Sequence, residues 1–333
     1  MPETNLKAGI TAVGKFLPSK RLTNKELESI VDTSDEWIKS RTGIKERRIA
    51  QTGQVSSHMC VEAYKDLLKS KNIDSNDINA IIVGTVTPDM LFPSTACLIQ
   101  DRIAAKNAWG FDLSAACSGF LFALETGTRM IESGRYDKIL VFGVDTMSSI
   151  INYEDRNTCI LFGDGAGVVL LEPIEDGSGV IDTKMRIDGS GGQFLNMKAG
   201  GSAMPASHET VDQKLHYVYQ DGGSVFKYAV KGMANISGDV AERNNLSSDD
   251  IALFIPHQAN KRIIDAAGRR LGVPKEKVLV NIDKYANTTA ATIPIALAEA
   301  VEKKMLKKHD NVILSAFGAG FTWGATYLKW SMN

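Results

Sequence analysis

The sequence predicts an α/β protein built from two similar halves, and three observations lead to that expectation. The chain of 333 residues is 44% apolar, which is enough for a large buried core. Short β-rich runs alternate with amphipathic helical segments along the whole length, which is typical of sheets covered by helices. Three pairs of segments also resemble each other, in the same order, at offsets of roughly 150 to 170 residues.

Six short runs are predicted as buried strands because they are apolar and rich in β-branched residues. They lie at residues 80–83, 110–113, 139–143, 253–256, 278–282 and 312–315. Three longer segments place apolar residues at the spacing of one helix face. These predicted helices cover residues 118–133, 261–271 and 293–304.

The internal repeat divides the chain into two parts. Residues 76–83 resemble 249–256, residues 111–117 resemble 281–287, and the glycine-rich run 165–167 resembles 318–320. The connection around residues 173–190 is rich in Gly and Asp, as is common between structural units. We predict an N-terminal half at residues 1–178, which carries a nucleophilic cysteine, and a C-terminal half at 179–333. The stretch 189–209 has little periodicity, and we expect a surface loop there.

Composition and charge argue against several classes of function. A net charge of -1 and a pI near 6.5 give no basic face for a nucleic-acid partner. No run reaches the roughly 18 apolar residues of a membrane helix, and no apolar signal core follows the polar first residues. The four cysteines lack metal-type and disulfide-type spacing. We therefore expect free thiols in a cytoplasmic protein, with neither a metal site nor a membrane partner.

Cys117 is the cysteine whose neighbours suggest chemistry. It lies in the run Asp-Leu-Ser-Ala-Ala-Cys-Ser-Gly-Phe, after a predicted strand and before a predicted helix. The positive end of a helix dipole lowers a thiol pKa from about 8.5, and small neighbours leave room for a substrate. The turn can also present the Cys117 backbone N–H to an oxyanion. From this segment alone, a cysteine used for packing is the commoner alternative, and packing is the role expected for Cys60, Cys97 and Cys159.

Two further polar residues lie at strand ends of the second half. His257 directly follows the predicted strand 253–256, and Asn287 lies between the predicted strand 278–282 and the next helix. Strand carboxyl ends are where open α/β sheets place their sites. Each residue alone could be structural, Asn287 as a cap or turn residue. Together with Cys117 they occupy related points of a repeated unit, which predicts that the two halves bring the three side chains together.

The motifs around these residues resemble those of β-ketoacyl-acyl carrier protein synthase III, the initiating condensing enzyme of type II fatty-acid synthesis. The matching segments are 35–38 (Asp-Glu-Trp-Ile), 41–44 (Arg-Thr-Gly-Ile), 115–119 (Ala-Ala-Cys-Ser-Gly), 162–167 (Phe-Gly-Asp-Gly-Ala-Gly), 257–260 (His-Gln-Ala-Asn) and 315–320 (Ser-Ala-Phe-Gly-Ala-Gly). The resemblance covers nearly the whole chain. It implies the thiolase-like duplicated fold, with two βαβαβαββ halves and sheets layered between helices as αβαβα. It also implies a Cys–His–Asn triad, whereas the chain-elongating relatives use Cys–His–His.

The resemblance further implies a reaction in two stages. Cys117 attacks an acyl-CoA and releases CoA, after which malonyl-acyl carrier protein enters and loses carbon dioxide. His257 Nε2 and Asn287 stabilise the resulting enolate, and the backbone N–H groups of Cys117 and Gly320 hold the oxyanion. The substrate's own carboxylate supplies the driving force, so we expect no metal and no redox cofactor.

Binding residues are implied by position in the same way. The residues expected to bind CoA and its pantetheine arm are Thr33, Trp37, Arg41, Arg156, Gly222, Phe226, Ala259 and Asn260. Helix spacing alone would also fit a solvated face, but the resemblance favours a basic patch that docks the acyl carrier protein. That patch consists of Lys227, Arg262, Arg269 and Arg270. Phe92 is expected to reach across a homodimer interface and help close the partner's acyl pocket.

Other functions fit these residues less well. The Gly-x-Gly-x-Gly run at 163–167 lacks the later glycine of a dinucleotide site, and no phosphate-loop motif occurs. A cysteine hydrolase would use the same residue types but has a different local signature. A non-enzymatic carrier-binding relative would have lost a triad member. A priming synthase or acyltransferase of a polyketide or secondary-metabolite pathway stays open as the alternative, and the starter acyl chain stays undefined, because pocket shape decides both.

Overall fold

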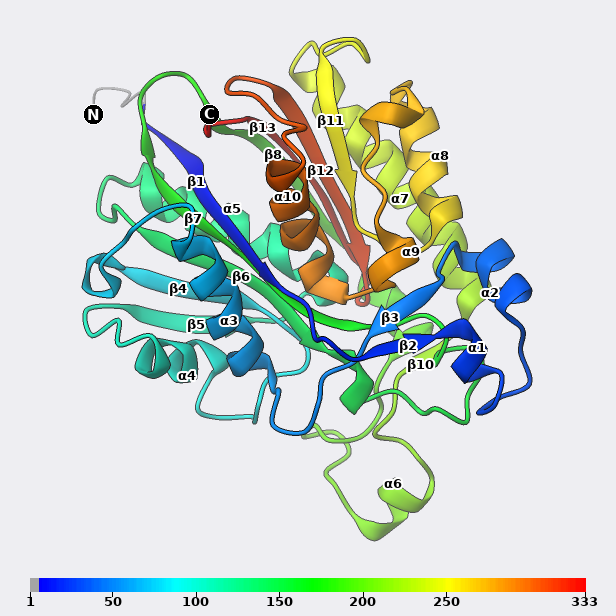
Figure 1. Ribbon diagram of the computed structural model, residues 1–333. Coiled ribbons are helices and arrows are strands. Elements are labelled where there is room, and N and C mark those ends of the chain that lie inside the picture. Colours follow the sequence, from blue (N-terminus) through cyan, green and yellow to red (C-terminus); the bar gives the residue numbers. More distant parts are fainter. Residues whose placement is uncertain (1–5) are drawn as a thin grey trace.

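Two β-sheets form the framework of the computed structural model, which describes residues 6–333 (Figure 1). The first sheet has the strand order β1–β7–β6–β4–β5, and the second has the order β11–β12–β13–β8. The strands are β1 (Lys7–Phe16), β4 (Ala80–Gly84), β5 (Trp109–Leu113), β6 (Ile139–Thr146), β7 (Asp164–Ile174), β8 (Gly179–Ile187), β11 (Ile251–Pro256), β12 (Asn311–Gly318) and β13 (Thr322–Lys329).

The second sheet repeats the arrangement of the first. β4 and β6 are parallel neighbours in the first sheet, as β11 and β12 are in the second. β7 then pairs antiparallel with both β6 and β1, and β13 pairs in the same way with β12 and β8. The duplication predicted from the sequence repeat is therefore confirmed at the level of strand order and direction.

The predicted strand at residues 278–282 is wrong. At the position equivalent to β5, the second sheet has a single bridge between Phe254 and Val278. A short 3-10 helix takes up Lys275–Lys277, and α9 (Ile282–Tyr285) begins five residues later. The Gln258 side chain accepts hydrogen bonds from the backbone N–H groups that open α9, so these groups are not free for strand pairing. The other predicted strands and helices are present, with ends that differ by a few residues.

Helices occupy three layers around the two sheets (Figure 1). One pair covers the outer face of the first sheet, one pair lies between the sheets, and one pair covers the outer face of the second sheet. In that order the pairs are α3 (Ser56–Leu68) with α4 (Thr95–Arg102), α5 (Gly119–Glu132) with α10 (Thr292–Glu302), and α7 (Gly222–Arg243) with α8 (Lys261–Leu271). This is the expected αβαβα layering.

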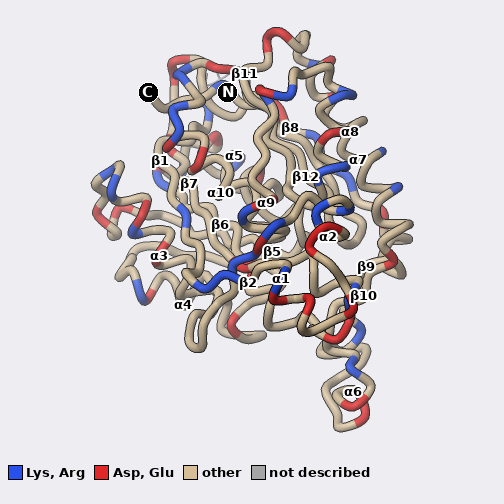
Figure 2. The backbone as a smooth tube through the Cα atoms, turned by 45° about the vertical axis from the view of Figure 1, so that its right-hand side comes forward, with Lys and Arg blue, Asp and Glu red and all other residues tan. Residues whose placement is uncertain are grey.

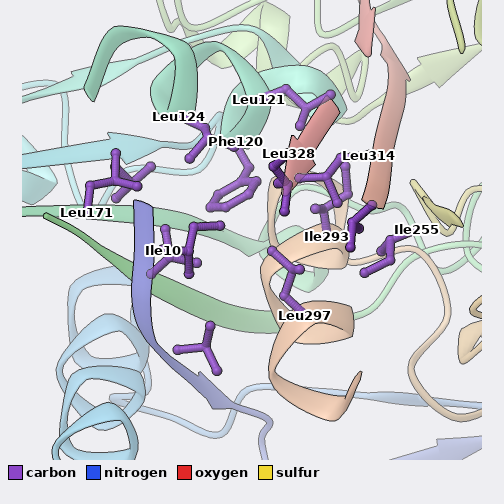
Figure 3. Packing of buried hydrophobic residues seen from close by; sticks show 14 of the residues in the cluster. Ile10, Phe120, Leu121, Leu124, Leu171, Ile255, Ile293, Leu297, Leu314 and Leu328 are labelled. Atoms are coloured by element: carbon purple, nitrogen blue, oxygen red, sulfur yellow. The ribbon is translucent and has the colours of Figure 1, made fainter. Parts of the chain in front are cut away.

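The central layer holds the largest apolar cluster. Phe120 and Leu124 of α5 and Ile293 and Leu297 of α10 point toward strand residues of both sheets (Figure 3). These side chains are almost fully buried, and burial of each stabilises the fold by roughly 1.5–3 kcal/mol. α5 and α10 follow Cys117 and Asn287 respectively, so the packing of the core also fixes both residues in space.

The connection between the halves runs from the end of β7 at Ile174 to the start of β8 at Gly179. The predicted division at residues 178/179 falls inside this connection, and we propose it as the boundary between the two halves. The predicted surface loop at 189–209 contains a 3-10 turn, Gly189–Gln193, and β9 (Leu195–Asn196), which pairs with β10 (Tyr219–Gln220). It leads into α6 (His208–Asp212), which projects from the body (Figure 1).

The remaining α-helices and strands lie between residues 21 and 48 of the chain. They are β2 (Arg21–Thr23), α1 (Asn24–Leu27), α2 (Asp35–Thr42) and β3 (Glu46–Arg48). Within residues 6–333 no helix has the length and apolar character needed to cross a membrane.

Candidate active site

Cys117, His257 and Asn287 line one cavity of about 560 Å³. Their exposed fractions are 8%, 1% and 7%, so the three side chains meet at the closed end of the cavity. Cys117 comes from the first half of the chain, and the other two residues come from the second. The structure therefore brings together the three residues that the repeat predicted to meet.

Cys117 and Asn287 lie in related turns. Cys117 belongs to a 3-10 turn, Ala116–Ser118, between β5 and α5. The residues that precede Cys117 and Asn287 are both alanines with positive φ, 47° at Ala116 and 57° at Ala286. A non-glycine residue in this region costs of order 1–3 kcal/mol, and a small side chain suffers fewest clashes there. The repeat thus extends to the backbone conformation that aims the two polar side chains.

The sequence-based expectation for the pKa of Cys117 is wrong. Burial raises the pKa of its thiol to about 12, and the charge of Asp145 adds to the rise. The backbone N–H of Cys117 and the side chain of Asn287 lower the pKa through hydrogen bonds, but by less. Desolvation of the thiolate outweighs the favourable end of the helix. In the free protein at neutral pH, Cys117 is therefore a protonated thiol and not a thiolate.

His257 is held from both sides of its backbone. Its own N–H donates to the carbonyl of Ser315 on β12 at 2.7 Å. The adjacent Gln258 is buried, and its amide Nε2 donates to the carbonyls of Pro256 and Leu279. Burial lowers the pKa of His257 to about 3, so the imidazole is neutral at pH 7. Its Nδ1 lies 2.6 Å from Thr292 Oγ1, and its Nε2 has no hydrogen-bond partner within residues 6–333.

Asn287 connects the two halves through its backbone. Its N–H donates to the carbonyl of Leu161, and its carbonyl accepts from the N–H of Gly163, both at 3.0 Å. Its side-chain Oδ1 accepts from the N–H of Thr289 at 2.9 Å. That bond turns the oxygen of the amide toward its own chain, which leaves Nδ2 to face the cavity.

Asp145 is a buried carboxylate that sequence reasoning missed. Its Oδ1 accepts from Val86 N–H at 2.8 Å and Thr87 Oγ1 at 2.8 Å, and also from Thr85 Oγ1 and Thr87 N–H. Its Oδ2 accepts from Thr289 Oγ1 and from the N–H of Ala290. Asp145 thus ties the end of β4 to the turn after Asn287. The sequence did contain a signal for this residue, because an acidic side chain follows shortly after an apolar predicted strand.

The outer part of the cavity contains most of the predicted CoA-binding residues. Those that line it are Trp37, Arg41, Gly222, Phe226, Ala259 and Asn260. Asn260 donates from Nδ2 to the carbonyl of Arg41 at 3.0 Å and caps α8, so it joins α2 to α8. Arg156 does not line the cavity, but its guanidinium lies 4.6 Å from the centre of the Trp37 ring. Thr33 lies nearby in the chain, just before α2, and does not line the cavity either.

The predicted docking residues lie on α7 and α8, where Figure 2 shows several basic residues. Lys227, Arg262, Arg269 and Arg270 are all exposed. Arg262 lies 4.7 Å from the centre of the Phe226 ring and also lines the cavity. The basic surface and the cavity entrance are therefore continuous at Arg262.

Neither Phe92 nor Gly320 lines the cavity. Phe92 is 84% exposed and does not line the cavity of its own chain. Gly320 follows β12 in a loop that contacts the nucleophile turn, where Thr322 Oγ1 donates to the carbonyl of Ala115 at 2.8 Å. At the end of β12, a Cβ atom added at Gly318 would lie 2.7 Å from the backbone nitrogen of Cys117. Glycine at 318 therefore lets the strand end approach the nucleophile closely.

Phe317 was inside a quoted motif but had no predicted role. Its ring is 6% exposed and lines the active-site cavity. It also lines a second cavity of about 460 Å³ on the outer side, together with Trp323 and Lys231. Phe317 therefore lines both cavities.

The other cysteines divide into two kinds. Cys60 and Cys159 are buried, whereas Cys97 is exposed, so its predicted packing role is wrong. Cys97 lies on the surface side of α4, and its Sγ accepts from Ser94 Oγ. Within residues 6–333 no group of three or more His, Cys, Asp or Glu side chains is arranged to hold a metal ion.

Comparison with known proteins places this geometry in a family. The family model described as "3-Oxoacyl-[acyl-carrier-protein (ACP)] synthase III" matches residues 111–189, and the model of its C-terminal part matches 241–330. The beta-ketoacyl-[acyl-carrier-protein] synthase III of Koribacter versatilis is 56% identical over 98% of both chains. Two solved structures are similar over 97% of this chain. The 3-oxoacyl-[acyl-carrier-protein] synthase III from Aquifex aeolicus is 43% identical, with 100% of its own chain covered and a TM-score of 0.89. The priming β-ketosynthase from the R1128 polyketide pathway is 32% identical, with 96% covered and a TM-score of 0.90.

The terms 3-oxoacyl and β-ketoacyl describe the same acyl group, so these matches agree with one another. The first matched segment contains Cys117, and the second contains His257 and Asn287. The similar structures also confirm the expected thiolase-like fold. The chain belongs to the β-ketoacyl-acyl carrier protein synthase III family.

Proposed function

We propose that this protein is an acyltransferase that condenses a short acyl-CoA with malonyl-acyl carrier protein and so initiates type II fatty-acid synthesis. The observation that carries the proposal is the shared cavity of Cys117, His257 and Asn287, which extends outward to Trp37 and Arg41. A thiol beside two neutral nitrogen groups suits acyl transfer between thioesters. The names of the family relatives support the same reaction.

In the first step, Cys117 Sγ attacks the carbonyl carbon of the acyl-CoA. A carbon–sulfur bond to Cys117 forms, the bond to the CoA sulfur breaks, and the thiol proton ends on the released CoA. Because the pKa of Cys117 is about 12 in the free protein, the proton leaves as the substrate reacts and not beforehand.

In the second step, the malonyl thioester loses carbon dioxide, and the electron pair of the broken carbon–carbon bond becomes an enolate. His257 Nε2 and Asn287 Nδ2 are proposed to donate hydrogen bonds to the enolate oxygen. The carbanion attacks the acyl carbonyl, the new carbon–carbon bond completes a β-ketoacyl-carrier thioester, and the expelled Cys117 thiolate takes up a proton from solvent. Removal of one such donor typically costs on the order of 100-fold in turnover. The reaction needs neither a metal nor a redox cofactor, because decarboxylation supplies the electron pair.

The oxyanion formed at the acyl carbonyl is proposed to lie between the backbone N–H groups of Cys117 and Gly320. Two hydrogen bonds support this pairing, because they tie the Gly320 loop to the nucleophile turn. Thr322 Oγ1 donates to the carbonyl of Ala115, and Ser118 Oγ donates to the carbonyl of Thr322 at 3.1 Å. A rigid pair of donors is what stabilises a developing charge.

We propose that the CoA nucleotide lies at the outer end of the cavity. Trp37 would stack on the adenine, with Thr33, Arg41 and Arg156 beside the nucleotide. The pantetheine arm would run inward along Gly222, Phe226, Ala259 and Asn260, which line the cavity. Arg156 would then move off the Trp37 ring, on which it stacks in the free protein.

Two protein partners are proposed. The acyl carrier protein is acidic, and Lys227, Arg262, Arg269 and Arg270 would receive it beside the cavity entrance. A second copy of this chain would cover the exposed loop that contains Met90, Leu91 and Phe92, with Phe92 completing the partner's acyl pocket. A cytoplasmic location stays a prediction, supported by the four unpaired cysteines.

A second candidate is the priming step of a polyketide or secondary-metabolite pathway. It is favoured by the likeness to the priming β-ketosynthase of the R1128 pathway, at 32% identity over 97% of this chain. The triad chemistry would be the same, and only the starter acyl group and the carrier protein would differ.

Intact-mass measurement tests the proposal. The protein is incubated with acetyl-CoA, propionyl-CoA and a branched short acyl-CoA, with and without malonyl-acyl carrier protein, beside Cys117→Ala. We expect an acyl adduct on the wild type alone, and its discharge as a β-ketoacyl-carrier product when the malonyl carrier is added. The adduct that forms fastest identifies the starter. An adduct that the malonyl carrier never discharges would contradict the synthase assignment and leave an acyltransferase with another acceptor.

A further inference from the structure

The two ring nitrogens of His257 lie in different surroundings. Nε2 faces the cavity and has no hydrogen-bond partner within residues 6–333, whereas Nδ1 lies 2.6 Å from Thr292 Oγ1. Both residues are almost fully buried, at 1% and 2% exposed. A neutral imidazole has one N–H, and the partner of one ring nitrogen decides which nitrogen carries it. Thr292 therefore controls whether Nε2 can donate or accept a hydrogen bond.

The hydroxyl of Thr292 has one proton and two possible acceptors. One is His257 Nδ1 at 2.6 Å, and the other is the carbonyl of Thr289 at 3.1 Å. That carbonyl already accepts the backbone N–H of Thr292, so it does not depend on the hydroxyl. The hydroxyl proton can therefore point to Nδ1 without leaving the Thr289 carbonyl unpaired.

We propose that the Thr292 hydroxyl fixes His257 in the tautomer that carries its proton on Nε2, so that Thr292 is a positioning residue for the condensation step. The proposal rests on the proposed function, in which Nε2 donates to the enolate. With Nδ1 accepting from Thr292, the N–H of His257 points into the cavity beside Cys117 and Asn287. The low pKa of His257 keeps the ring neutral, so a choice between the two tautomers exists at pH 7.

The same short segment orients the second donor. The N–H of Thr289 holds Asn287 Oδ1 at 2.9 Å, which directs Asn287 Nδ2 toward the cavity. Residues 289–292 therefore orient two N–H donors toward one place, as stabilisation of a single enolate oxygen requires. An Nε2–H group cannot accept the proton of Cys117, so His257 is not the base of the acylation step.

Nitrogen-15 NMR of histidine-labelled protein tests the tautomer directly, because protonated and bare ring nitrogens differ widely in chemical shift. The chain has five histidines, and the signals of His257 are identified by their loss in His257→Gln. We expect an N–H signal at Nε2 and a bare nitrogen at Nδ1. Thr292→Ser keeps the hydroxyl and should keep this pattern, whereas Thr292→Val removes it and should give a mixture of tautomers.

Rates of the two half-reactions give an independent test. In Thr292→Val we expect discharge of the acyl-enzyme by malonyl-acyl carrier protein to slow by about tenfold to 100-fold. Formation of the acyl adduct on Cys117 should change by less than about threefold, and Thr292→Ser should restore discharge. Thr128→Val is the matched control, because Thr128 is fully buried and its hydroxyl has no partner within residues 6–333. It should leave both rates unchanged.

Two results would overturn the proposal. One is a bare Nε2 in the wild type, which would make His257 an acceptor in the free protein. The other is a Thr292→Val variant that slows acylation as much as discharge. If Thr292→Val fails to fold, the spectra of the wild type and Thr292→Ser still decide the tautomer. Failure of the wild type to discharge its acyl group would contradict the proposed function and not the tautomer, which the spectra measure without substrate.

Discussion

His257 stays neutral in the folded protein because burial lowers its pKa from the ordinary 6.5 to about 3. In the unfolded chain the pKa returns to about 6.5, so the unfolded state takes up a proton first as the pH falls. The stability that depends on a neutral His257 is therefore fully present above pH 6.5. It is lost progressively as the pH falls toward 3.

Replacement of His257 by Gln should flatten this part of the stability curve. Urea unfolding of the wild type and His257→Gln between pH 7.5 and 4.5 measures the difference in unfolding free energy. Below pH 6.5 the wild type should lose stability faster than the variant, by at most about 1.4 kcal/mol per pH unit. His208→Gln is the control, because His208 is exposed on α6, and its curve should run parallel to that of the wild type.

Asp145→Asn should destabilise the protein by about 2–5 kcal/mol in urea unfolding. The carboxylate accepts hydrogen bonds at both oxygens, whereas an amide would place an NH₂ group against two of the donors. Discharge of the acyl-enzyme should also slow, because Asp145 holds the turn after Asn287. Asp32→Asn, at a fully exposed carboxylate, should change neither property. An Asp145→Asn protein of wild-type stability would contradict the role assigned to this carboxylate.

Sequence reasoning predicted that Cys117, His257 and Asn287 lie together, because each follows a predicted strand in a repeated unit, and the three residues do line one cavity. It failed on the pKa of Cys117, since the depth of a pocket depends on chains that meet only in three dimensions. Asp145 was missed for the same reason, because its partner Thr289 lies 144 residues away in the sequence. Roles that depend on local turns are readable from sequence, and roles that depend on distant partners are not.

At the scale of elements, strand β4 sets the position of α5. β4 ends at Gly84, where an added Cβ atom would lie 2.6 Å from the carbonyl carbon of Gly119 at the start of α5. The backbone fixes both the added Cβ atom and the Gly119 carbonyl carbon, so neither can rotate away. Helix α5 and the Cys117 turn before it would therefore have to move. Displacement of a reacting group by about 1 Å can cost about 100-fold in rate.

Gly84→Ala should therefore slow acylation of Cys117 by at least about tenfold and reduce stability by about 1–3 kcal/mol. Acyl-adduct formation by mass and urea unfolding measure the two effects. Gly238→Ala is the matched control, since Gly238 lies inside α7 with no atom within 4 Å of an added Cβ. That change should leave acylation intact and raise stability by about 0.5–1 kcal/mol. Normal acylation in Gly84→Ala would show that the contact is not needed.

The elements that were predicted correctly have strong local patterns, such as α8, whose bounds match at both ends. The strand predicted at 278–282 failed although its residues are apolar and β-branched. There, Gln258 binds the backbone N–H groups of Asn281 and Ile282, and this contact overrides local propensity. This failed prediction concerns a segment next to the site, where polar contacts replace regular strand pairing.

At the scale of the whole molecule, the order of the layers brings two strand ends to one cavity. They are the end of β5, which leads to Cys117, and the end of β11, which leads to His257. The repeat predicted two related halves from the residues themselves, and the five-layer order came only from the family resemblance. Nothing in the local sequence says which faces of two sheets meet, because both faces are apolar. The apolar cluster that α5 and α10 share with strands of both sheets in the central layer (Figure 3) is the long-range fact that sequence reasoning lacked.

The exposed loop at Met90, Leu91 and Phe92 predicts self-association. Leu91 and Phe92 are each 84% exposed, and large apolar side chains grouped in this way are typical of an interface. Sedimentation velocity should show a dimer for the wild type, and Phe92→Asp should shift it toward monomer by at least tenfold in dissociation constant. Ile187→Asp, at an exposed apolar residue of β8, should leave the dimer intact. A monomeric wild type at micromolar concentration would contradict this prediction.

Phe317 lines both the inner cavity and the outer one, and we expect it to affect how much of the acyl group on Cys117 is condensed rather than hydrolysed. An acyl group on Cys117 must survive until the second substrate arrives, and bulk water competes for it during that wait. Phe317→Ala would join the two cavities and admit solvent from behind. We expect the ratio of free acid to condensed product to rise at least fivefold by mass spectrometry. Asn235→Ala, at an exposed residue that lines the outer cavity and not the inner one, should leave the ratio unchanged. A single aromatic ring would then keep solvent away from the acyl-enzyme and so determine how much of the bound acyl group is condensed rather than hydrolysed.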